Sequence, residues 1–361
     1  MAELVILHFQ PLERYPPILN IINTFKSSYN KKFRVFSLQR VYDASLKSTE
    51  IISFRPSKKS WLNHLIFNIS SLYQLIRLRP KIVLYFETYS SLPAIIYKIL
   101  RPSVKLYIHY HEYTSIEEYN KSTTFTKFLH TIEKRIYNRA QWISHTNQDR
   151  LTKFSIDYNL SQSAHLFTLA NYPPRKWYST HKIKTDRKLN LVYIGYDLDP
   201  TTSYIKELVG WIEKYPEKCT LSIYTHLPCN YLLREKPLPI NVFLYGSVSY
   251  FDLPKVLKKY DLGLVLYKPH TFNYTYNIPN KFYEYLACKL NVIYPISMNG
   301  LHNFVQENKV QLATGIDFED ENMMDNLLSN NFENFPQPEL EIYKKFTCEN
   351  ELFNLLNMLT N

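Results

Sequence analysis

The sequence predicts an α/β protein with two doubly wound, Rossmann-like domains in tandem, and three observations support this fold class. Short apolar runs typical of buried strands alternate with amphipathic segments along the chain. Such alternation implies a parallel sheet covered by helices on both faces. The length of 361 residues suits two domains of ordinary size. The composition also changes near the middle, because all six glycines lie in the second half.

Charge is distributed as unevenly as glycine. Residues 1–180 contain 25 Lys and Arg against 11 Asp and Glu, a net charge of +14, whereas residues 181–361 contain 18 against 21, a net of −3. A polar segment with two prolines, Asn171–His181, separates the halves and is typical of a linker. We therefore expect an N-terminal domain over 1–175, a linker over 176–188, a second domain over 189–340 and a closing helix over 341–361.

The first half contains the elements of one doubly wound domain. Apolar runs predict strands at Leu4–Phe9, Phe33–Leu38, Ile82–Phe86, Lys105–Tyr110, Trp142–His145 and His165–Leu169. Helical spacing predicts helices at Ile18–Phe25, Ser60–Leu78, Leu92–Leu100 and Phe125–Tyr137. The clearest pattern is that of Ser60–Leu78, where Trp61, Leu65, Ile69 and other residues at this spacing predict one apolar face.

The second half repeats this arrangement. Strands are predicted at Leu191–Ile194, Thr220–Tyr224, Val242–Tyr245 and Leu262–Leu266, and helices at Tyr204–Lys214 and Phe251–Lys258. A long loop, Tyr267–Ile278, then leads to a further helix and strand, and another strand and helix follow around Gly300. A late amphipathic segment runs from Glu339 to Leu359.

The stretch Ile278–Pro295 carries the strongest functional signal. A Pro-Asn pair precedes a short helix, and Asn291–Tyr294 is typical of a buried strand. Lys281 and Glu284 are three residues apart, so they share one helix face. A lysine can hold phosphate oxygens and a carboxylate can accept hydrogen bonds from two sugar hydroxyls, but the same spacing also suits a surface ion pair.

This stretch resembles the donor-site segment of GT-B glycosyltransferases, especially the retaining family 4 (glycosyl transferases group 1). The positions that match in register are Pro279, Asn280, Lys281, Glu284, Tyr285, Ala287, Val292 and Ile293. The resemblance implies that Glu284 holds the ribose of a nucleotide sugar. Three positions depart from the pattern: Lys289 replaces a helix-closing Gly, Asn291 replaces a Pro, and Tyr276 replaces a second Glu that contacts the donor sugar.

Other segments resemble the same family in the same order. They are His109-Tyr-His111-Glu112, Ile132–Ala140, Asn171-Tyr-Pro173, Tyr245-Gly246 and Tyr260–Leu264. The resemblance implies a GT-B fold, with the active-site cleft between two domains and the last helix crossing back to the first domain. It also implies that His111 approaches the donor sugar, which makes His111 the candidate catalytic residue and Glu112 a further candidate.

Several residues are candidates for the contacts with the diphosphate. The resemblance implies an Arg and a Lys shortly after Gly195, but Tyr196 stands where the Arg is expected and Lys206 is only a loose candidate. Lys281 and the helix start near Gly300 are the alternatives, because free N–H groups and the helix dipole favour anions. Asn280, Gly195 and Gly300 therefore join the candidate donor-binding residues, with Tyr276 as a further one.

We expect no metal and no cofactor besides the nucleotide sugar. The cysteines are scattered with no Cys-x-x-Cys spacing, which argues against a structural zinc site. His109 and His111 share one strand face, but no third ligand stands at a suitable spacing. A satisfied histidine at a strand end is the alternative for each. Asp197-Leu-Asp199 resembles a metal motif of another glycosyltransferase fold, in an unsuitable context.

The positive charge of the first half has three possible explanations: a nucleic-acid partner, an anionic membrane surface or a solvated face. No helix-turn-helix, zinc or RNA-binding motif is present, which argues against nucleic acid. Basic residues lie at both ends of the helix that contains Trp61. Lys58 and Lys59 are at one end, and Arg77 and Arg79 are at the other. They suit either an anionic membrane surface or a solvated face. With no signal peptide or spanning segment in the sequence, we expect a cytoplasmic protein, peripheral on the inner face of the plasma membrane.

The expected function is transfer of a sugar from a nucleotide sugar to a glycan or lipid-linked acceptor, in surface polysaccharide or glycolipid biosynthesis. Retention of the anomeric configuration is implied by the family resemblance alone. An inverting enzyme is one alternative, and it would need a general base such as Glu87, Glu112 or Asp43. A non-catalytic relative that binds nucleotides or glycans is the other alternative.

Overall fold

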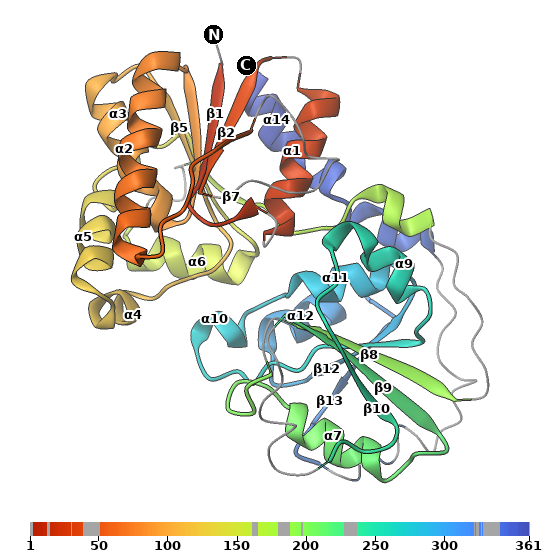
Figure 1. Ribbon diagram of the computed structural model, residues 1–361. Coiled ribbons are helices and arrows are strands. Elements are labelled where there is room, and N and C mark those ends of the chain that lie inside the picture. The colour runs from red at the N-terminus through yellow and green to blue at the C-terminus, as the bar shows by residue number, and fades with distance from the viewer. Residues whose placement is uncertain are drawn as a thin grey trace. The chain divides into compact units, whose positions relative to one another are not determined.

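The computed structural model describes residues 3–12, 15–29, 31–38, 51–160, 165–179, 188–195, 198–226, 237–320, 322, 325, 327 and 340–360 (Figure 1). Asp43, Tyr196 and Asp197 lie outside the described residues, and so do residues 180–187 of the expected linker. The chain divides into two compact units. Unit 1 comprises Met1–Ala170 and Glu351–Asn361, and unit 2 comprises Asn171–Asn350.

Unit 1 contains a seven-stranded sheet in the order β3-β2-β1-β4-β5-β6-β7. Its strands are β1 Leu4–His8, β2 Phe33–Ser37, β3 Ile51–Ser53, β4 Ile82–Phe86, β5 Lys105–Tyr110, β6 Trp142–His145 and β7 Leu166–Thr168. Every neighbouring pair is parallel. The carboxyl ends of β1, β4, β5 and β6 therefore meet at one edge of the sheet.

Helices cover both faces of this sheet. They are α1 Pro16–Ser28, α2 Ser60–Leu78, α3 Ser91–Leu100, α4 Ile116–Lys121, α5 Thr124–Glu133, α6 Gln148–Asp157 and α14 Cys348–Thr360. Figure 1 shows α2 and α3 on one side of the strands and α1 and α14 on the other. The C-terminal part of α14 is tied to the sheet, because the Tyr107 hydroxyl donates to the Met358 carbonyl over 3.0 Å.

Helix α2 spans the predicted residues, but its apolar face is not buried. Its buried residues are Phe67, Asn68, Ser71 and Leu75. The exposed side chains follow the predicted apolar spacing instead, and Trp61 is 62% and Ile69 59% exposed. Phe67 and Leu75 pack into unit 1 together with Asn68 and Ser71, and a stripe of other large apolar residues is exposed.

Unit 2 contains a six-stranded sheet in the order β10-β9-β8-β11-β12-β13. Its strands are β8 Leu189–Gly195, β9 Cys219–Thr225, β10 Val242–Tyr245, β11 Leu262–Leu264, β12 Asn291–Pro295 and β13 Ala313–Ile316. These pairs are also all parallel. Two parallel sheets with flanking helices confirm the predicted α/β class with two doubly wound, Rossmann-like domains.

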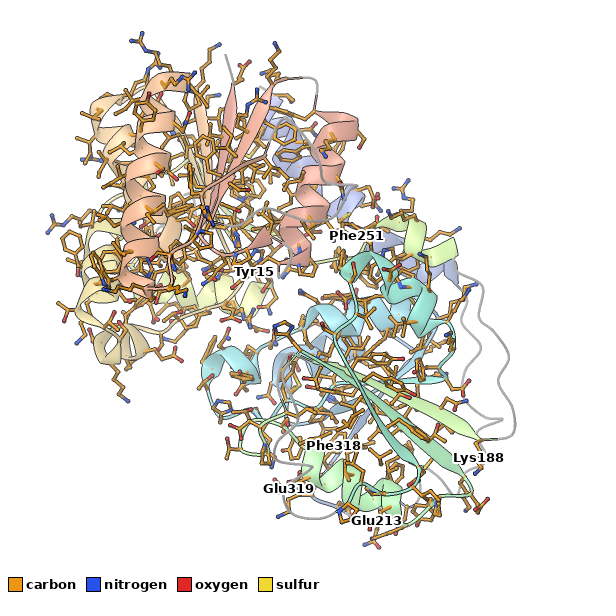
Figure 2. The ribbon with its side chains drawn as sticks, viewed as in Figure 1. Tyr15, Lys188, Glu213, Phe251, Phe318 and Glu319 are labelled. Atoms are coloured by element: carbon orange, nitrogen blue, oxygen red, sulfur yellow. The ribbon has the colours of Figure 1, made fainter. Side chains whose placement is uncertain are left out.

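The helices of unit 2 are α7 Ile205–Glu213, α9 Leu253–Leu257, α10 Phe272–Thr275, α11 Asn280–Ala287 and α12 Asn299–Glu307. The apolar face of α7 joins the inner strands in one core, with Ile205, Leu208, Leu221 and Leu264 all buried. Phe318, labelled in Figure 2, adds to this core by stacking on Tyr204 with 5.2 Å between ring centroids. None of the helices in the described residues is long and apolar enough to cross a bilayer.

Candidate active site

The residues on either side of helix α11 have backbone conformations that start and end the helix. Pro279 precedes it with extended dihedral angles, φ −72° and ψ 147°, and gives the first turn no side-chain cap. At its end Lys289 has φ 64°, and the N–H of Leu290 donates to the Tyr285 carbonyl over 3.0 Å. Lys289 therefore takes the left-handed conformation in which glycine usually closes a helix, at the position where the family pattern has that glycine.

Tyr285 anchors α11 against the sheet. Its hydroxyl accepts a hydrogen bond from the backbone N–H of Ile194 over 3.1 Å. Its ring covers Gly263 in β11 so closely that a Cβ atom there would lie 2.4 Å from ring carbons. A glycine in β11 therefore lets the helix sit close to the strand ends, and this position fixes Lys281 and Glu284.

Lys281 is buried and has no polar partner among the residues that the structure describes. Its side chain is only 8% exposed, and its Nζ makes no hydrogen bond within the described residues. The ammonium lies over two aromatic rings, 4.3 Å from the centroid of Tyr193 and 4.8 Å from that of Tyr267. Cation–π contacts offset part of the cost of burial, but an unpaired buried charge remains unfavourable. The site is therefore suited to an anion.

Glu284 lies one turn along the same helix and is 7% exposed. Burial raises the pKa of its carboxyl to about 7, and the nearby charge of Lys281 opposes this rise. No ion pair joins Lys281 and Glu284 within the described part of the chain. The surface position and surface ion pair considered from the sequence are therefore wrong, because both side chains are buried.

The N-terminus of a second helix, α12, contains Gly300. It is buried in the first turn of α12, and a Cβ atom at this residue would lie 2.6 Å from the backbone carbon and oxygen of Tyr276. Only glycine permits this approach. The residue before the helix, Met298, provides no side-chain cap, so the first turn of α12 presents backbone N–H groups that can donate hydrogen bonds to an anion.

The remaining donor-site candidates differ in how closely they join this group. Asn280 is the first residue of α11 and is partly buried, as is Tyr276. Gly195 ends β8, and a Cβ atom there would meet the Tyr193 ring at 2.6 Å. Lys206, by contrast, lies exposed on α7, and its ammonium makes no hydrogen bond or ion pair with any other described residue. The structure therefore does not join Lys206 to the Lys281 group.

Tyr193 and Tyr267 are the residues of this group that sequence reasoning missed. They form the aromatic surroundings of the Lys281 ammonium, although they lie far from it in sequence. The only signal was position, since Tyr193 stands two residues before Gly195 and Tyr267 begins the loop after β11. Neither position reveals by itself that a lysine from α11 lies over the ring.

The carboxyl edge of the unit 1 sheet gathers histidines. His109 and His111 lie on one face as expected, with 4.7 Å between ring centroids, and His111 stacks on Phe86. His109 is the deeper of the two, and its Nδ1 lies 2.8 Å from Ser144 Oγ. Burial lowers the pKa of His109 well below its usual value. Its imidazole is therefore neutral at physiological pH.

Further groups complete this edge. Tyr15, labelled in Figure 2, lies against the rings of His8 and His111, 4.5 Å and 5.9 Å away between centroids. Glu112 follows His111 and is exposed. Among the described residues no three His, Cys, Asp or Glu side chains are arranged to ligate one metal ion.

Comparison with known proteins gives matches in structure rather than in sequence. The chain matches no protein-family model and no curated protein sequence. Alr3699/HepE of Anabaena, solved with UDP and glucose, is 14% identical, with both chains covered in full and a TM-score of 0.71. The lipopolysaccharide outer core galactosyltransferase WaaB is 14% identical over 99% of each chain, with a TM-score of 0.67.

A protein of another activity shares the same architecture. UDP-GlcNAc 2-epimerase from Methanocaldococcus jannaschii is 12% identical over 99% of each chain, with a TM-score of 0.63. At such identities the likeness concerns the fold and leaves the reaction to the residues of the site. The two parallel-sheet units, together with these matches over the whole chain, show that the protein has the GT-B fold.

Proposed function

We propose that this protein is a glycosyltransferase that moves a sugar from a nucleotide sugar to a glycan or lipid-linked acceptor. The observation that carries this proposal is the buried ammonium of Lys281, which has no hydrogen-bond partner among the described residues, beside the buried carboxyl of Glu284. Both lie on a helix at the carboxyl end of a parallel sheet, which is where ligands bind in open α/β sheets. A nucleoside diphosphate offers the anion and the sugar hydroxyls that these two groups need.

In this proposal Lys281 and the first turn of α12 hold the diphosphate. Negative charge grows on the diphosphate as the bond to the sugar breaks, so preorganised positive groups stabilise the transition state. The close packing of Gly300 on Tyr276 sets the position of the α12 N–H groups. Because Lys281 supplies positive charge from the protein, we expect transfer to continue in the presence of EDTA.

Glu284 takes the ribose in this assignment. An ionised carboxylate can accept two hydrogen bonds from neighbouring hydroxyls. Its pKa of about 7 implies that nucleotide affinity rises with pH through neutrality, because only the ionised form is an acceptor on both oxygens.

His111 is assigned to the donor sugar, with retention of the anomeric configuration. The alternative inverting reaction needs a free general base. Glu87, one candidate for it, accepts the backbone N–H of His111 at 2.6 Å, so its carboxyl already has a structural partner. NMR of the product anomer decides between the two outcomes.

The experiment that tests the function is a panel of nucleotide sugars, assayed for hydrolysis and for transfer to glycan and lipid-linked acceptors. Lys281→Met is expected to weaken nucleoside diphosphate binding by about 10- to 100-fold, since hydrogen bonds to charged groups contribute about 1.5–3 kcal/mol. Lys255→Met is the matched control, because Lys255 is exposed and pairs with Asp252 at 2.8 Å on α9.

Three results would contradict the proposal. No turnover and no binding with any nucleotide sugar would remove the function altogether, and binding without turnover would favour a non-catalytic relative. Interconversion of the sugar without an acceptor would instead indicate epimerase chemistry.

His111→Ala is expected to lower kcat far more than it weakens binding of the bare nucleoside diphosphate, because contacts with the reacting sugar act in the transition state. His109→Ala, deeper in the strand, is expected to lower the melting temperature instead. Loss of turnover in His109→Ala at an unchanged melting temperature, with His111→Ala silent, would reverse the assignment.

The proposed acceptor side includes an anionic membrane surface. Large apolar side chains of α2 face outward, Trp61 and Ile69 among them. Exposed basic residues lie at both ends of the helix, Lys58 and Lys59 before its first residue and Arg77 in its last turn. An apolar stripe flanked by Lys and Arg is the pattern of a helix that binds an anionic bilayer surface, and supports a peripheral location on the cytoplasmic leaflet.

Vesicle binding tests this surface. Trp61→Ser combined with Lys58→Glu is expected to reduce binding to anionic vesicles, and salt is expected to reduce binding of the unaltered protein because ions screen exposed charges. Phe243→Ser is the control, since this residue is an exposed aromatic on β10 of unit 2. Equal binding to neutral and anionic vesicles would contradict the electrostatic part.

A further inference from the structure

Glu87, the residue directly after β4, has a backbone conformation that suits glycine. Its dihedral angles are φ 60° and ψ 156°, a region that residues with a side chain rarely occupy. The backbone is held there from both sides, because the N–H of Glu87 donates to the His109 carbonyl over 3.1 Å and its own carbonyl accepts from Ser90 over 3.0 Å. Strain of this kind persists only where the surrounding structure enforces it.

The side chain of Glu87 makes use of this conformation. Its Oε1 accepts a hydrogen bond from the backbone N–H of His111 over 2.6 Å, and the backbone of Glu112 also hydrogen-bonds to the carboxyl. The carboxyl therefore holds the turn that follows β5. Its burial and the neighbouring charge of Glu112 raise the pKa of Glu87 to about 8.

The other side of His111 is held by a charge of opposite sign. The guanidinium Nη1 of Arg150, on α6, donates to the His111 carbonyl over 2.8 Å and to Thr146 Oγ1 over 2.8 Å. Arg150 is 2% exposed, so its position is fixed by packing. The backbone of His111 is thus held at its N–H by a carboxyl and at its carbonyl by a guanidinium.

We propose that Glu87 is a positioning residue, which works with Arg150 to fix the backbone of His111 and so aims its imidazole at the reacting sugar. This inference rests on the proposed role of His111. It explains why a strained residue with a side chain stands after β4: glycine would relieve the strain but could not hold the His111 N–H. A misplacement of about 1 Å in such a group costs about 100-fold in rate.

Three substitutions of Glu87 separate positioning from a merely structural role. Glu87→Gln keeps a carbonyl oxygen that can accept the N–H, and we expect kcat to stay near that of the unaltered protein. Glu87→Ala loses the acceptor and keeps the strain, whereas Glu87→Gly loses the acceptor and the strain together. We expect kcat to fall about 100-fold in both, with unchanged nucleoside diphosphate affinity and a higher melting temperature for Glu87→Gly than for Glu87→Ala.

Two outcomes of these assays overturn the proposal. Full turnover in Glu87→Gly means that the carboxyl has no positioning role. A Glu87→Gln variant as slow as Glu87→Ala means that the ionisable group itself is required, as in a general base.

A second measurement does not depend on activity. The chain contains 11 histidines, so labelling histidine with ¹⁵N gives a short set of backbone amide signals, and His111→Gln identifies the His111 signal by its loss. We expect amide exchange at His111 to be slow in the unaltered protein and in Glu87→Gln, and at least about tenfold faster in Glu87→Ala and Glu87→Gly. Unchanged exchange in Glu87→Gly overturns the proposal, whereas absence of any sugar transfer with the expected exchange pattern contradicts only the proposed function.

Discussion

Chain segments approach one another closely near the carboxyl edges of both sheets, and the two units permit this approach in different ways. Unit 2 uses glycine: Gly263 admits the Tyr285 ring and Gly300 admits the Tyr276 backbone. Residues 1–170 of unit 1 contain no glycine, and Glu87, a residue with a side chain, has a φ of 60° there. None of the described glycines has a positive φ, whereas Arg79, Glu87 and Lys289 do. At these positions glycine therefore provides space, and residues with side chains carry the unusual dihedral angles.

A large effect is expected at the buried carboxyl of unit 2. The pKa of Glu284 is raised from 4.5 to about 7 by burial, so the folded state binds the proton more tightly than the unfolded state. Stability is therefore expected to fall as pH rises from about 4.5 to about 7, by about 3 kcal/mol in total. Glu284→Gln removes this dependence and is expected to exceed the unaltered protein in stability at pH 8 but not at pH 4.

Denaturant unfolding at several pH values measures this difference. Parallel pH dependences for the two proteins would mean that Glu284 keeps an ordinary pKa. Glu87→Gln gives the matching test in unit 1. Because the pKa of Glu87 is about 8, the pH range over which its burial lowers stability ends about one pH unit higher than the range for Glu284.

A smaller effect is expected where glycine provides space. Gly300→Ala places a Cβ atom 2.6 Å from backbone atoms of Tyr276, and such overpacking costs about 1–3 kcal/mol. Gly210→Ala is the control, because Gly210 lies in α7 with nothing within 4 Å of an added Cβ atom. There alanine is expected to stabilise the helix by about 0.5–1 kcal/mol. Melting temperatures of the pair give the result, and equal shifts would refute the spatial explanation.

The smallest effect is expected where a residue other than glycine has a left-handed backbone conformation. Lys289→Gly and Arg79→Gly each replace a residue with φ near 60° at a helix end. Because glycine avoids the left-handed penalty of roughly 1–2 kcal/mol but loses more entropy on folding, we expect a net gain of about 0.5–1 kcal/mol in each unit. Lys214→Gly, at a helix end with φ −70°, should destabilise the protein instead. A loss in Lys289→Gly would show that its side chain contributes more than the backbone strain costs.

Much of the fold could be predicted, because apolar runs such as Ile82–Phe86 and Val242–Tyr245 are bounded by clear turn signals and are strands as expected. Helix α6 was missed because Leu151 and Phe154 are too few for an apolar stripe. Helix α4 was missed although its capping box, Ser115 with Glu118, is a signal in the sequence.

The candidate site was predictable in part. Sequence likeness identified Lys281 and Glu284, but their burial depends on tertiary packing by Tyr193, Tyr267 and Tyr285, which local patterns do not encode. The exposure of the apolar face of α2 could not be predicted for the same reason, since spacing shows that a face is apolar but not what covers it. The strained turn at Glu87 arises from hydrogen bonds to β5 and to His111, and these are contacts between segments distant in sequence.

The return of α14 to unit 1 has a consequence for synthesis of the chain. Unit 1 is discontinuous: the 180 residues Asn171–Asn350 separate its main part from Glu351–Asn361. At about 5–20 residues per second, a ribosome needs on the order of 10 to 40 s to add them. During that time the Tyr107 hydroxyl lacks the Met358 carbonyl to which it donates. The domain translated first is therefore the one completed last, and the nascent chain exposes the α14 side of its first sheet until translation reaches the C-terminal helix.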